Sequence, residues 1–308
     1  MKKTSKKVVF FGSGPVAAAT LERLSQLFAI EAVITKKRPT HHKDKAPVEE
    51  LAKNKGLTTF FCSTKKELDT LVDKKHFRSL VGIIVDYGVI VSQKSIDKFE
   101  LGIINSHFSL LPQWRGADPI TFSILSGQKK TGVSLMLIEP TLDTGKLLVQ
   151  KSLAIKDSDT TPSLTTKLIV LSNSLLEEYI PRYLNGEVKL RAQSHPERAS
   201  YSRQLIKNDG MIDWNKPAMD IEREIRAYAG WPGSKTKFKD INLTITKAHC
   251  VEYNFNDTKP GSVKIIQKEA KLIVRASDGY ISVTDLKPDG KKEMSIKAFL
   301  AGYGSRIT

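Results

Sequence analysis

The stretch Val8-Val9-Phe10-Phe11-Gly12-Ser13-Gly14-Pro15-Val16-Ala17 decides the fold of the first half of the chain. Four consecutive apolar residues are typical of a strand that is buried on both faces, as the strands of parallel sheets are. The glycines permit a tight turn, and proline is favoured in the first turn of a helix. The stretch therefore predicts a strand, a turn and a helix in direct succession, which is how a βαβ unit begins.

The same alternation of apolar runs and helical patterns continues through the first half of the chain. The predicted strands are 8–11, 30–34, 80–85, 102–105, 133–138 and 147–153, and the predicted helices are 15–28, 48–55 and 161–183. Strands that are separated by helices indicate a mostly parallel, Rossmann-like sheet. This α/β domain is expected to occupy residues 1–188.

The last third of the chain has a different pattern. A predicted helix at 219–229 precedes short alternating segments at 236–238, 242–248, 261–266, 271–276 and 281–286, with turn signals between them. Short strands at this spacing predict a small β-barrel of the oligonucleotide-binding type over residues 208–308. The stretch 189–207 is basic and without periodicity, and it predicts an interdomain linker.

The overall composition favours a globular protein with anionic partners. The chain has 308 residues, a formal net charge of +16 and only two cysteines, Cys62 and Cys250. Such a charge favours nucleic acid, acidic lipid or anionic metabolites, although a solvated lysine-rich surface would also account for it. The two distant cysteines indicate neither a disulfide framework nor a thiolate metal site. No window approaches the ~18 apolar residues of a membrane span, so a cytoplasmic protein without membrane contact is expected.

The glycine turn has two interpretations. Gly12-Ser13-Gly14-Pro15-Val16-Ala17 matches a loose form of the dinucleotide fingerprint, and Glu31 lies roughly where a ribose-binding acid would be. Such short patterns also arise wherever a strand turns tightly into a helix. We favour the tight turn and keep a nicotinamide site as the alternative.

Three polar residues form the candidate catalytic group. Asn105 and His107 lie two residues apart at the end of a predicted strand, so their side chains point to the same face. Asp143 lies in a predicted turn between two later strands. Ligands of open α/β sheets bind at the carboxyl ends of the strands, where these residues are expected to meet. Each residue alone is also an ordinary turn or surface residue.

This group suits acyl transfer to an amine. An amide and a protonated imidazole can donate hydrogen bonds to an oxyanion, which is the main requirement of such a reaction. A carboxylate can hold the imidazole in its charged form and accept the amine proton. No nucleophilic serine or cysteine is needed when the acyl donor is already activated.

A long, ordered series of motifs surrounds these three residues. It consists of 105–120 (NSHFSLLPQWRGADPI), 131–133 (TGV) and 142–145 (LDTG), and further along 211–214 (MIDW), 226–233 (RAYAGWPG) and 286–294 (LKPDGKKEM). Together these motifs resemble the methionyl-tRNA formyltransferase family over essentially the whole chain.

The resemblance implies a donor, a site and a reaction. Asn105, His107 and Asp143 would be the catalytic residues, and 10-formyltetrahydrofolate would be the formyl donor, without a metal or a nicotinamide. The expected folate-binding residues are Ser109, Leu110, Leu111, Pro112, Asp86, Tyr87, Gly88, Val89 and Ile90. The acceptor would be the α-amino group of initiator methionyl-tRNA, for translation initiation, and the protein is expected to be a monomer.

The distribution of charge supports a tRNA acceptor. Basic residues exceed acidic ones in both predicted domains and in the linker, which suits a large polyanion. The expected tRNA-binding residues are Lys36, Lys37, Arg38, Lys43, Lys45, Arg203 and Lys207. The loop that carries the first five of them is shorter and poorer in glycine than is usual in the family. An amino-sugar nucleotide is the alternative acceptor, and the hydrolase portion of a formyltetrahydrofolate dehydrogenase is a further alternative enzyme. A non-catalytic RNA-binding protein is the alternative of a different class.

Overall fold

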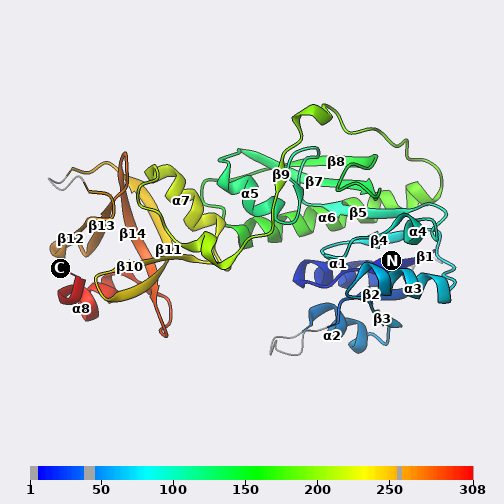
Figure 1. The fold of residues 1–308 in the computed structure, drawn as a ribbon, viewed down its shortest axis with the longest axis horizontal. Coiled ribbons are helices and arrows are strands. Elements are labelled where there is room, and N and C mark those ends of the chain that lie inside the picture. Colours follow the sequence, from blue (N-terminus) through cyan, green and yellow to red (C-terminus); the bar gives the residue numbers. More distant parts are fainter. Residues whose placement is uncertain (1–5, 38–45, 255–258, 308) are drawn as a thin grey trace. The chain divides into compact units, whose positions relative to one another are not determined.

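The computed structural model describes residues 6–37, 46–254 and 259–307, which form two compact units (Figure 1). Unit 1 contains residues 1–119, 130–154 and 165–203, and unit 2 contains residues 120–129, 155–164 and 204–308. The division thus passes through the chain at several points. The domain limits expected at residues 188 and 208 remain predictions.

Unit 1 is built on a seven-stranded sheet with the order β3-β2-β1-β4-β5-β7-β8. The first five strands in sequence are parallel, and β7 and β8 are antiparallel to their neighbours, which confirms the predicted mostly parallel sheet. The strand bounds are β1 Lys7–Phe11, β2 Ala29–Thr35, β3 Thr59–Phe61, β4 Gly82–Ile84, β5 Ile103–His107, β7 Lys130–Leu137 and β8 Leu147–Ala154.

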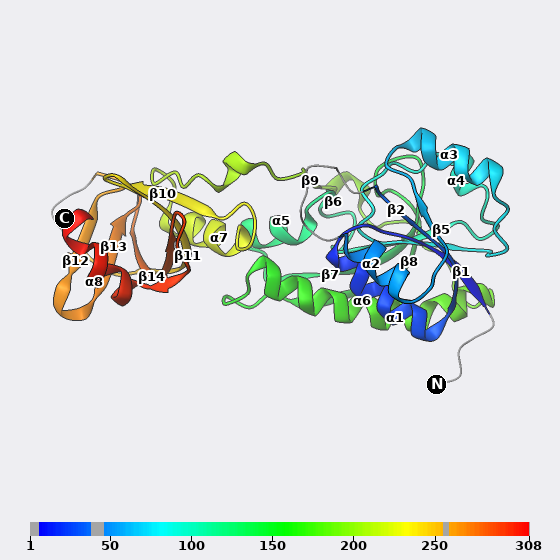
Figure 2. The same cartoon turned by 90° about the horizontal axis from the view of Figure 1, so that it is seen from below.

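Helices cover both faces of this sheet. They are α1 Pro15–Leu27, α2 Pro47–Asn54, α3 Lys65–Lys74, α4 Gln93–Ile96 and α6 Thr161–Leu184, whereas α5 Pro119–Leu125 lies almost entirely in unit 2. Helices α1, α2 and α6 lie on one face, and α3 and α4 lie on the other (Figure 2). Because both faces are covered, Val8 to Phe11 of β1 are completely buried, as the apolar run predicts.

The turn between β1 and α1 needs its first glycine for reasons of space. A Cβ atom on Gly12 would lie 2.5 Å from the Cβ of Ala17 and 2.7 Å from the carbonyl oxygen of Val85. Strand, turn and helix are therefore packed too closely for any side chain here. This close approach explains the glycine without a bound dinucleotide.

Strand β3 and helix α3 are not evident from the sequence pattern. Helix α3 is mostly polar and buries only Leu68 and Val72 completely, so its apolar stripe is short. Its beginning is fixed instead by Thr64, whose side chain accepts a hydrogen bond from the Glu67 amide. Strand β3 has only three residues and lies at the edge of the sheet.

The segment 189–203 belongs to unit 1 and pairs with its other parts through the backbone. Its strand β9, Tyr201–Ser202, pairs in parallel with β6, Arg115–Gly116, and Arg191 forms a bridge with Leu147. These contacts use backbone groups, so the side chains show no periodic pattern. The segment predicted as a linker therefore has a fixed course along unit 1.

Unit 2 contains an antiparallel sheet with the order β10-β11-β14-β13-β12, and β15 pairs with β14. The bounds are α7 Ala218–Ala227, β10 Ser234–Phe238, β11 Ile241–Val251, β12 Val263–Ile266, β13 Lys271–Arg275, β14 Tyr280–Pro288, β15 Met294–Ser295 and α8 Ile296–Ile307. The antiparallel second domain is confirmed. Within the described part of the chain, no backbone pairing joins β10 to β12, so the hydrogen-bonded order is open.

We predict that Phe299→Ala destabilises unit 2 by about 3–5 kcal/mol, because a completely buried aromatic ring leaves a cavity. Urea denaturation followed by tryptophan fluorescence measures the change, since Trp214 and Trp231 belong to unit 2. Lys297→Ala is the matched control, because Lys297 is an exposed residue of the same helix. Equal stability of the two variants would contradict the assignment of Phe299 to the core.

Candidate functional site

The carboxyl end of β5 brings the three predicted catalytic residues together. Asn105 Nδ2 lies 3.4 Å from Asp143 Oδ1, and His107 Nδ1 lies 3.7 Å from Asp143 Oδ2. The His107 and Asp143 side chains are only 6% and 11% exposed, and Asn105 is half-buried. The alternation of the strand thus directs an amide and an imidazole to the same carboxylate.

Backbone contacts hold Asp143 in place. Its φ angle of 51° lies in the left-handed region, which aspartate tolerates better than most residues. Its Oδ2 accepts a hydrogen bond from the Gly116 amide at 2.8 Å, and its carbonyl oxygen accepts one from Gln193 Nε2 at 2.7 Å. A Cβ on Gly116 would lie 2.2 Å from the Ser202 carbonyl oxygen, so only glycine fits there.

Both ring nitrogens of His107 face oxygen atoms. Nε2 lies 2.9 Å from the Trp114 carbonyl oxygen, while Nδ1 faces Asp143. An imidazolium satisfies both acceptors, because both of its nitrogens are donors. The contact to Asp143 is longer than a hydrogen bond, so Nδ1 is the donor that an oxygen of a substrate can engage.

The segment Ser109 to Pro112, expected to border a folate, is fixed by two polar side chains from β7 and β8. Ser134 Oγ donates to the Ser109 carbonyl oxygen at 2.6 Å and accepts from the Leu111 amide at 3.2 Å. Gln150 Nε2 donates to the Leu111 carbonyl oxygen at 2.6 Å. Ser109 is completely buried and its hydroxyl donates to the Gln113 carbonyl oxygen, so its role here is structural.

The loop Asp86 to Ile90, also expected to bind folate, follows β4 at the same edge of the sheet. Tyr87 is buried and its hydroxyl donates to the Cys62 carbonyl oxygen at 2.9 Å, which anchors the loop. Ile90 is 74% exposed. Among the described residues, none forms a backbone hydrogen bond with the amides or carbonyls of residues 88–90. These groups are therefore available to a ligand.

Asp86 is a carboxyl group with unusual surroundings. Although its side chain remains accessible to solvent, the protein around it desolvates the carboxylate and raises the pKa to about 6. The Lys36 ammonium group opposes this rise in the pKa, and the Asp118 carboxylate adds to it. Asp86 is thus partly protonated near neutral pH.

The Asp86 side chain also lies directly against the glycine turn between β1 and α1. Its Oδ2 lies 1.9 Å from the point where a Cβ on Gly14 would be, and its carbonyl oxygen accepts a hydrogen bond from the Ser13 amide at 3.0 Å. A dinucleotide would bring its pyrophosphate to this turn at the beginning of α1. The carboxyl group stands in that place, which argues against the nicotinamide alternative.

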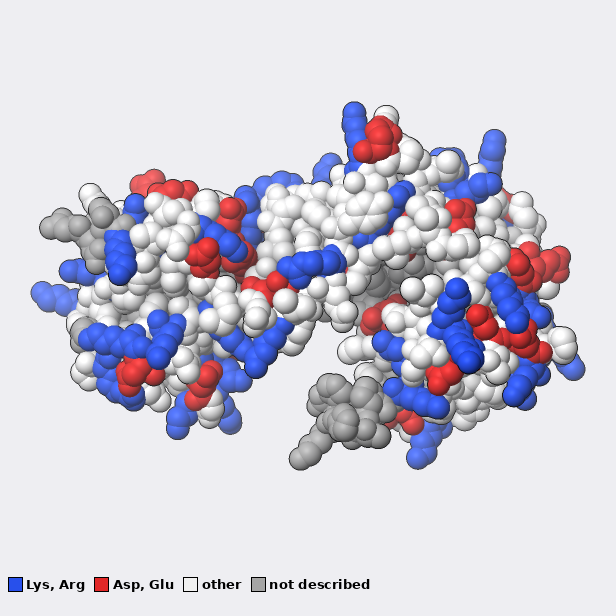
Figure 3. All heavy atoms as spheres, viewed as in Figure 1, with Lys and Arg blue, Asp and Glu red and all other residues white. Residues whose placement is uncertain are grey.

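The predicted tRNA-binding residues that the structure describes are distributed over both units. Lys36 faces the Asp86 loop, and Lys37 Nζ lies 3.9 Å from Glu67 Oε1. Arg203 and Lys207 are exposed, the first in unit 1 and the second in unit 2. Arg38, Lys43 and Lys45 lie outside the described residues. Lysine and arginine side chains are spread over the face drawn in Figure 3.

Several residues of the site were not predicted from the sequence. Gln193 donates to the carbonyl oxygens of Asp143 and Gly145 and accepts from the buried Arg115 guanidinium at 2.7 Å. It belongs to an aperiodic stretch that contacts the site through the backbone, so no pattern marks it. Arg115 belongs to the motif at residues 105–120, but its pairing with Gln193 became evident only from the structure, in which its side chain is buried.

No helix among the described residues combines the length and the apolar character that a membrane crossing requires. No group of three or more histidine, cysteine, aspartate or glutamate side chains gathers in them in a way that could hold a metal ion. The expected absence of a metal remains a prediction.

Comparison with known proteins shows similarity along the whole chain. Residues 6–180 match the profile described as formyl transferase, and residues 204–304 match the one described as formyl transferase, C-terminal domain. A methionyl-tRNA formyltransferase of Caldanaerobacter subterraneus is 33% identical over 305 residues, which cover 96% of this chain and 97% of that protein. One from Myxococcus xanthus is 32% identical over 304 residues, 96% of this chain and 95% of its own length.

Solved structures share the fold. An N-formyltransferase from Helicobacter canadensis, determined with folinic acid and dTDP-3-aminofucose, aligns with a TM-score of 0.68. It is 20% identical, and the alignment covers 91% of this chain and 99% of that one. At this identity the likeness concerns the fold.

We predict that Asp86→Asn stabilises the protein near pH 7.5 and that this gain becomes smaller in acid. The raised pKa means that the folded state binds the proton more tightly than the unfolded state does, so the ionised carboxylate lowers stability most above about pH 6. As the pH falls below that value, protonation of the folded state reduces the penalty in the wild type. Asparagine also tolerates the φ of 46°.

Urea denaturation of the two proteins at about pH 7.5 and about pH 4.5 measures this difference. A stability difference that does not change with pH would contradict the raised pKa.

Proposed function

Because this chain belongs to the formyl transferase family, we propose that it transfers the formyl group of 10-formyltetrahydrofolate to the α-amino group of initiator methionyl-tRNA. The observation that carries this proposal is the convergence of Asn105, His107 and Asp143 at the carboxyl edge of the sheet, in a chain that is similar to methionyl-tRNA formyltransferases over its whole length. When bound, the folate supplies an activated formyl group.

The amine must lose a proton as the new carbon–nitrogen bond forms and the bond to the folate nitrogen breaks. Asp143 is the proposed acceptor of that proton, directly or through a water molecule. Its position suits this role, since Gly116 and Gln193 fix its backbone and one oxygen while Oδ1 has only a long contact to Asn105. The proton can then pass to the departing folate nitrogen.

Negative charge develops on the formyl oxygen during the transfer. Asn105 Nδ2 carries two hydrogens and uses one in the 3.4 Å contact with Asp143, so the other is available. A protonated His107 can offer its Nδ1 hydrogen to the same oxygen. Two fixed donors in a largely buried site are the usual means of stabilising such charge.

The residues of the expected donor site fit a folate. The exposed Ile90 provides apolar surface, and the backbone groups of residues 88–90 are available for hydrogen bonds with the edge of a heterocycle. Asp86 lies at the beginning of the same loop, and its elevated pKa allows it to donate or accept a hydrogen bond near neutral pH. These features support loop 86–90 as the pterin site.

Sequence identity to known proteins and the net charge of the chain both favour methionyl-tRNA as the acceptor. The methionyl-tRNA formyltransferase of Caldanaerobacter subterraneus matches with 33% identity over nearly its full length, whereas the N-formyltransferase determined with dTDP-3-aminofucose matches with 20% identity. A net charge of +16 also suits a polyanion better than a nucleotide with two phosphates. An amino-sugar nucleotide remains the alternative acceptor.

We predict that Asp143→Asn lowers the turnover of methionyl-tRNA formylation by about 10²–10⁴-fold, the usual contribution of a general base. Asparagine has the same size and tolerates the φ of 51°, so folate binding should change little. Single-turnover formylation and folate titration measure the two quantities separately. Asp157→Asn is the control, because Asp157 is an exposed acid 87% accessible to solvent. Turnover near that of the wild type would contradict the assigned role.

A further inference from the structure

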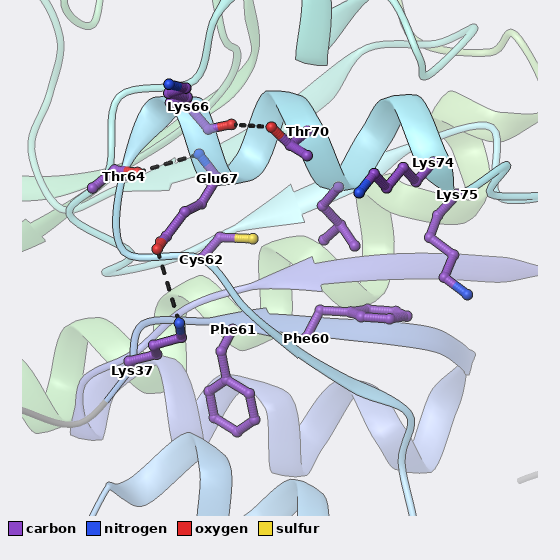
Figure 4. Close-up of a pocket in the computed structure, with 11 residues that line it drawn as sticks. Lys37, Phe60, Phe61, Cys62, Thr64, Lys66, Glu67, Thr70, Lys74 and Lys75 are labelled. Atoms are coloured by element: carbon purple, nitrogen blue, oxygen red, sulfur yellow. Dashed lines mark hydrogen bonds and ion pairs between the residues drawn. The ribbon is translucent and has the colours of Figure 1, made fainter.

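A pocket lies away from the catalytic residues, between the edge strand β3 and helix α3 (Figure 4). Its volume is about 590 Å³, within the range of ligand sites. We call it the β3–α3 pocket. It is lined by Lys37, Phe60, Phe61, Cys62, Thr64, Lys66, Glu67, Thr70, Leu71, Lys74 and Lys75.

The pocket has a fixed aromatic wall. Phe60 is half-buried and makes an edge-to-face contact with Phe77 at 6.4 Å, and Phe77 stacks on Phe99 at 5.9 Å. The Phe60 ring is therefore held by the core while one side borders the pocket. Lys75 Nζ lies 5.7 Å from the centre of that ring, so a cation already contacts the aromatic surface.

Positive charge dominates the rim of the pocket. Four lysines line it, Lys37 near the beginning of α3 and Lys74 and Lys75 at its end, with Lys66 in its first turn. All four are exposed, and no ion pair within the described residues involves Lys66, Lys74 or Lys75. The cations thus lie at both ends of the pocket.

The one acidic side chain of the lining is engaged in capping the helix. Glu67 Oε2 accepts a hydrogen bond from the Ser63 amide at 2.6 Å, and the Glu67 amide donates to Thr64 Oγ1 at 3.2 Å. Its contact with Lys37 is long, at 3.9 Å, and exposed, so it is weak. Glu67 therefore offsets one of the four lysine charges, and the lining keeps a net positive charge.

Lys66 has a position that helix stability does not explain. A basic residue in the first turn faces the positive end of the helix dipole, which is unfavourable by a few tenths of a kcal/mol or more. A residue that conflicts with its local structure is a candidate for a functional role.

Cys62, which also lines the pocket, is not a reactive thiol, because burial raises the pKa of its thiol to about 11 and keeps it protonated.

We propose that the β3–α3 pocket binds a single-stranded segment of RNA, with one base against Phe60 and the flanking phosphates near the lysines at its two ends. An aromatic surface between separated cations is the arrangement that single-stranded nucleic acids recognise. A lone nucleotide would need the cations gathered at one phosphate. The source of the segment is the tRNA acceptor, and to that extent the inference rests on the proposed function.

The first test measures the binding of a fluorescent octauridylate to the full chain at several salt concentrations. The variant Lys66→Gln/Lys74→Gln/Lys75→Gln should bind at least about tenfold more weakly, and its salt slope should fall by about 2, because three phosphate contacts are lost. The matched control is Lys53→Gln/Lys130→Gln/Lys151→Gln, which removes the same charge from exposed positions outside the pocket. Equal losses in both variants, or no loss in the pocket variant, would overturn the proposal.

The second test addresses stacking. Phe60→Leu keeps an apolar side chain in the core but removes the aromatic face, and it should weaken binding of the octauridylate by about tenfold without changing the salt slope. Thermal denaturation shows whether the variant remains folded. Wild-type affinity in a folded Phe60→Leu variant would exclude the stacking role.

Two further measurements distinguish a free nucleotide from a single strand of RNA as the ligand, and the proposed RNA site from the proposed enzymatic function. Uridine monophosphate should compete only weakly with the octauridylate, and tight binding of the free nucleotide would overturn the single-strand assignment. The pocket variant should also raise the KM for methionyl-tRNA while leaving kcat nearly unchanged, whereas an unchanged KM would separate the pocket from the acceptor. Octauridylate binding in a protein that formylates no tRNA would defeat the proposed function and leave the RNA site intact.

Discussion

The carboxylate of Asp143 is the group on which the arrangement of the site depends. It is nearly buried and in a left-handed backbone conformation, and it faces the amide of Asn105 and the imidazole of His107. A buried carboxylate of this kind is stable only when donors surround it. The Gly116 amide donates to its Oδ2, and Gln193, from the segment 189–203, fixes the loop by donating to the Asp143 carbonyl oxygen.

This constraint explains why a short, irregular segment has a fixed course. Strand β9 pairs with β6 next to Gly116, and the absence of a side chain on Gly116 lets the Ser202 carbonyl oxygen approach. The Ser200 hydroxyl also accepts a hydrogen bond from the Trp114 amide at 2.9 Å. The segment 189–203 thus contacts and supports the loops that hold the catalytic residues.

The sequence predicted those parts of the molecule in which side-chain pattern determines structure. Fully buried strands such as β1 appear as apolar runs, and the spacing of Asn105 and His107 follows from the alternation of a strand. Helix α3 was missed because its stability depends on a cap and a short apolar stripe. Gln193 was missed because its partners are carbonyl groups, which leave no periodic trace in the sequence.

The claim that matters most is the identity of the acceptor. The most direct measurement compares the rates at which the purified protein transfers the formyl group of 10-formyltetrahydrofolate to initiator methionyl-tRNA and to a dTDP-amino sugar. We predict that kcat/KM for methionyl-tRNA is larger by several orders of magnitude. Preferential formylation of the amino sugar would contradict this prediction and assign the catalytic residues to the alternative acceptor.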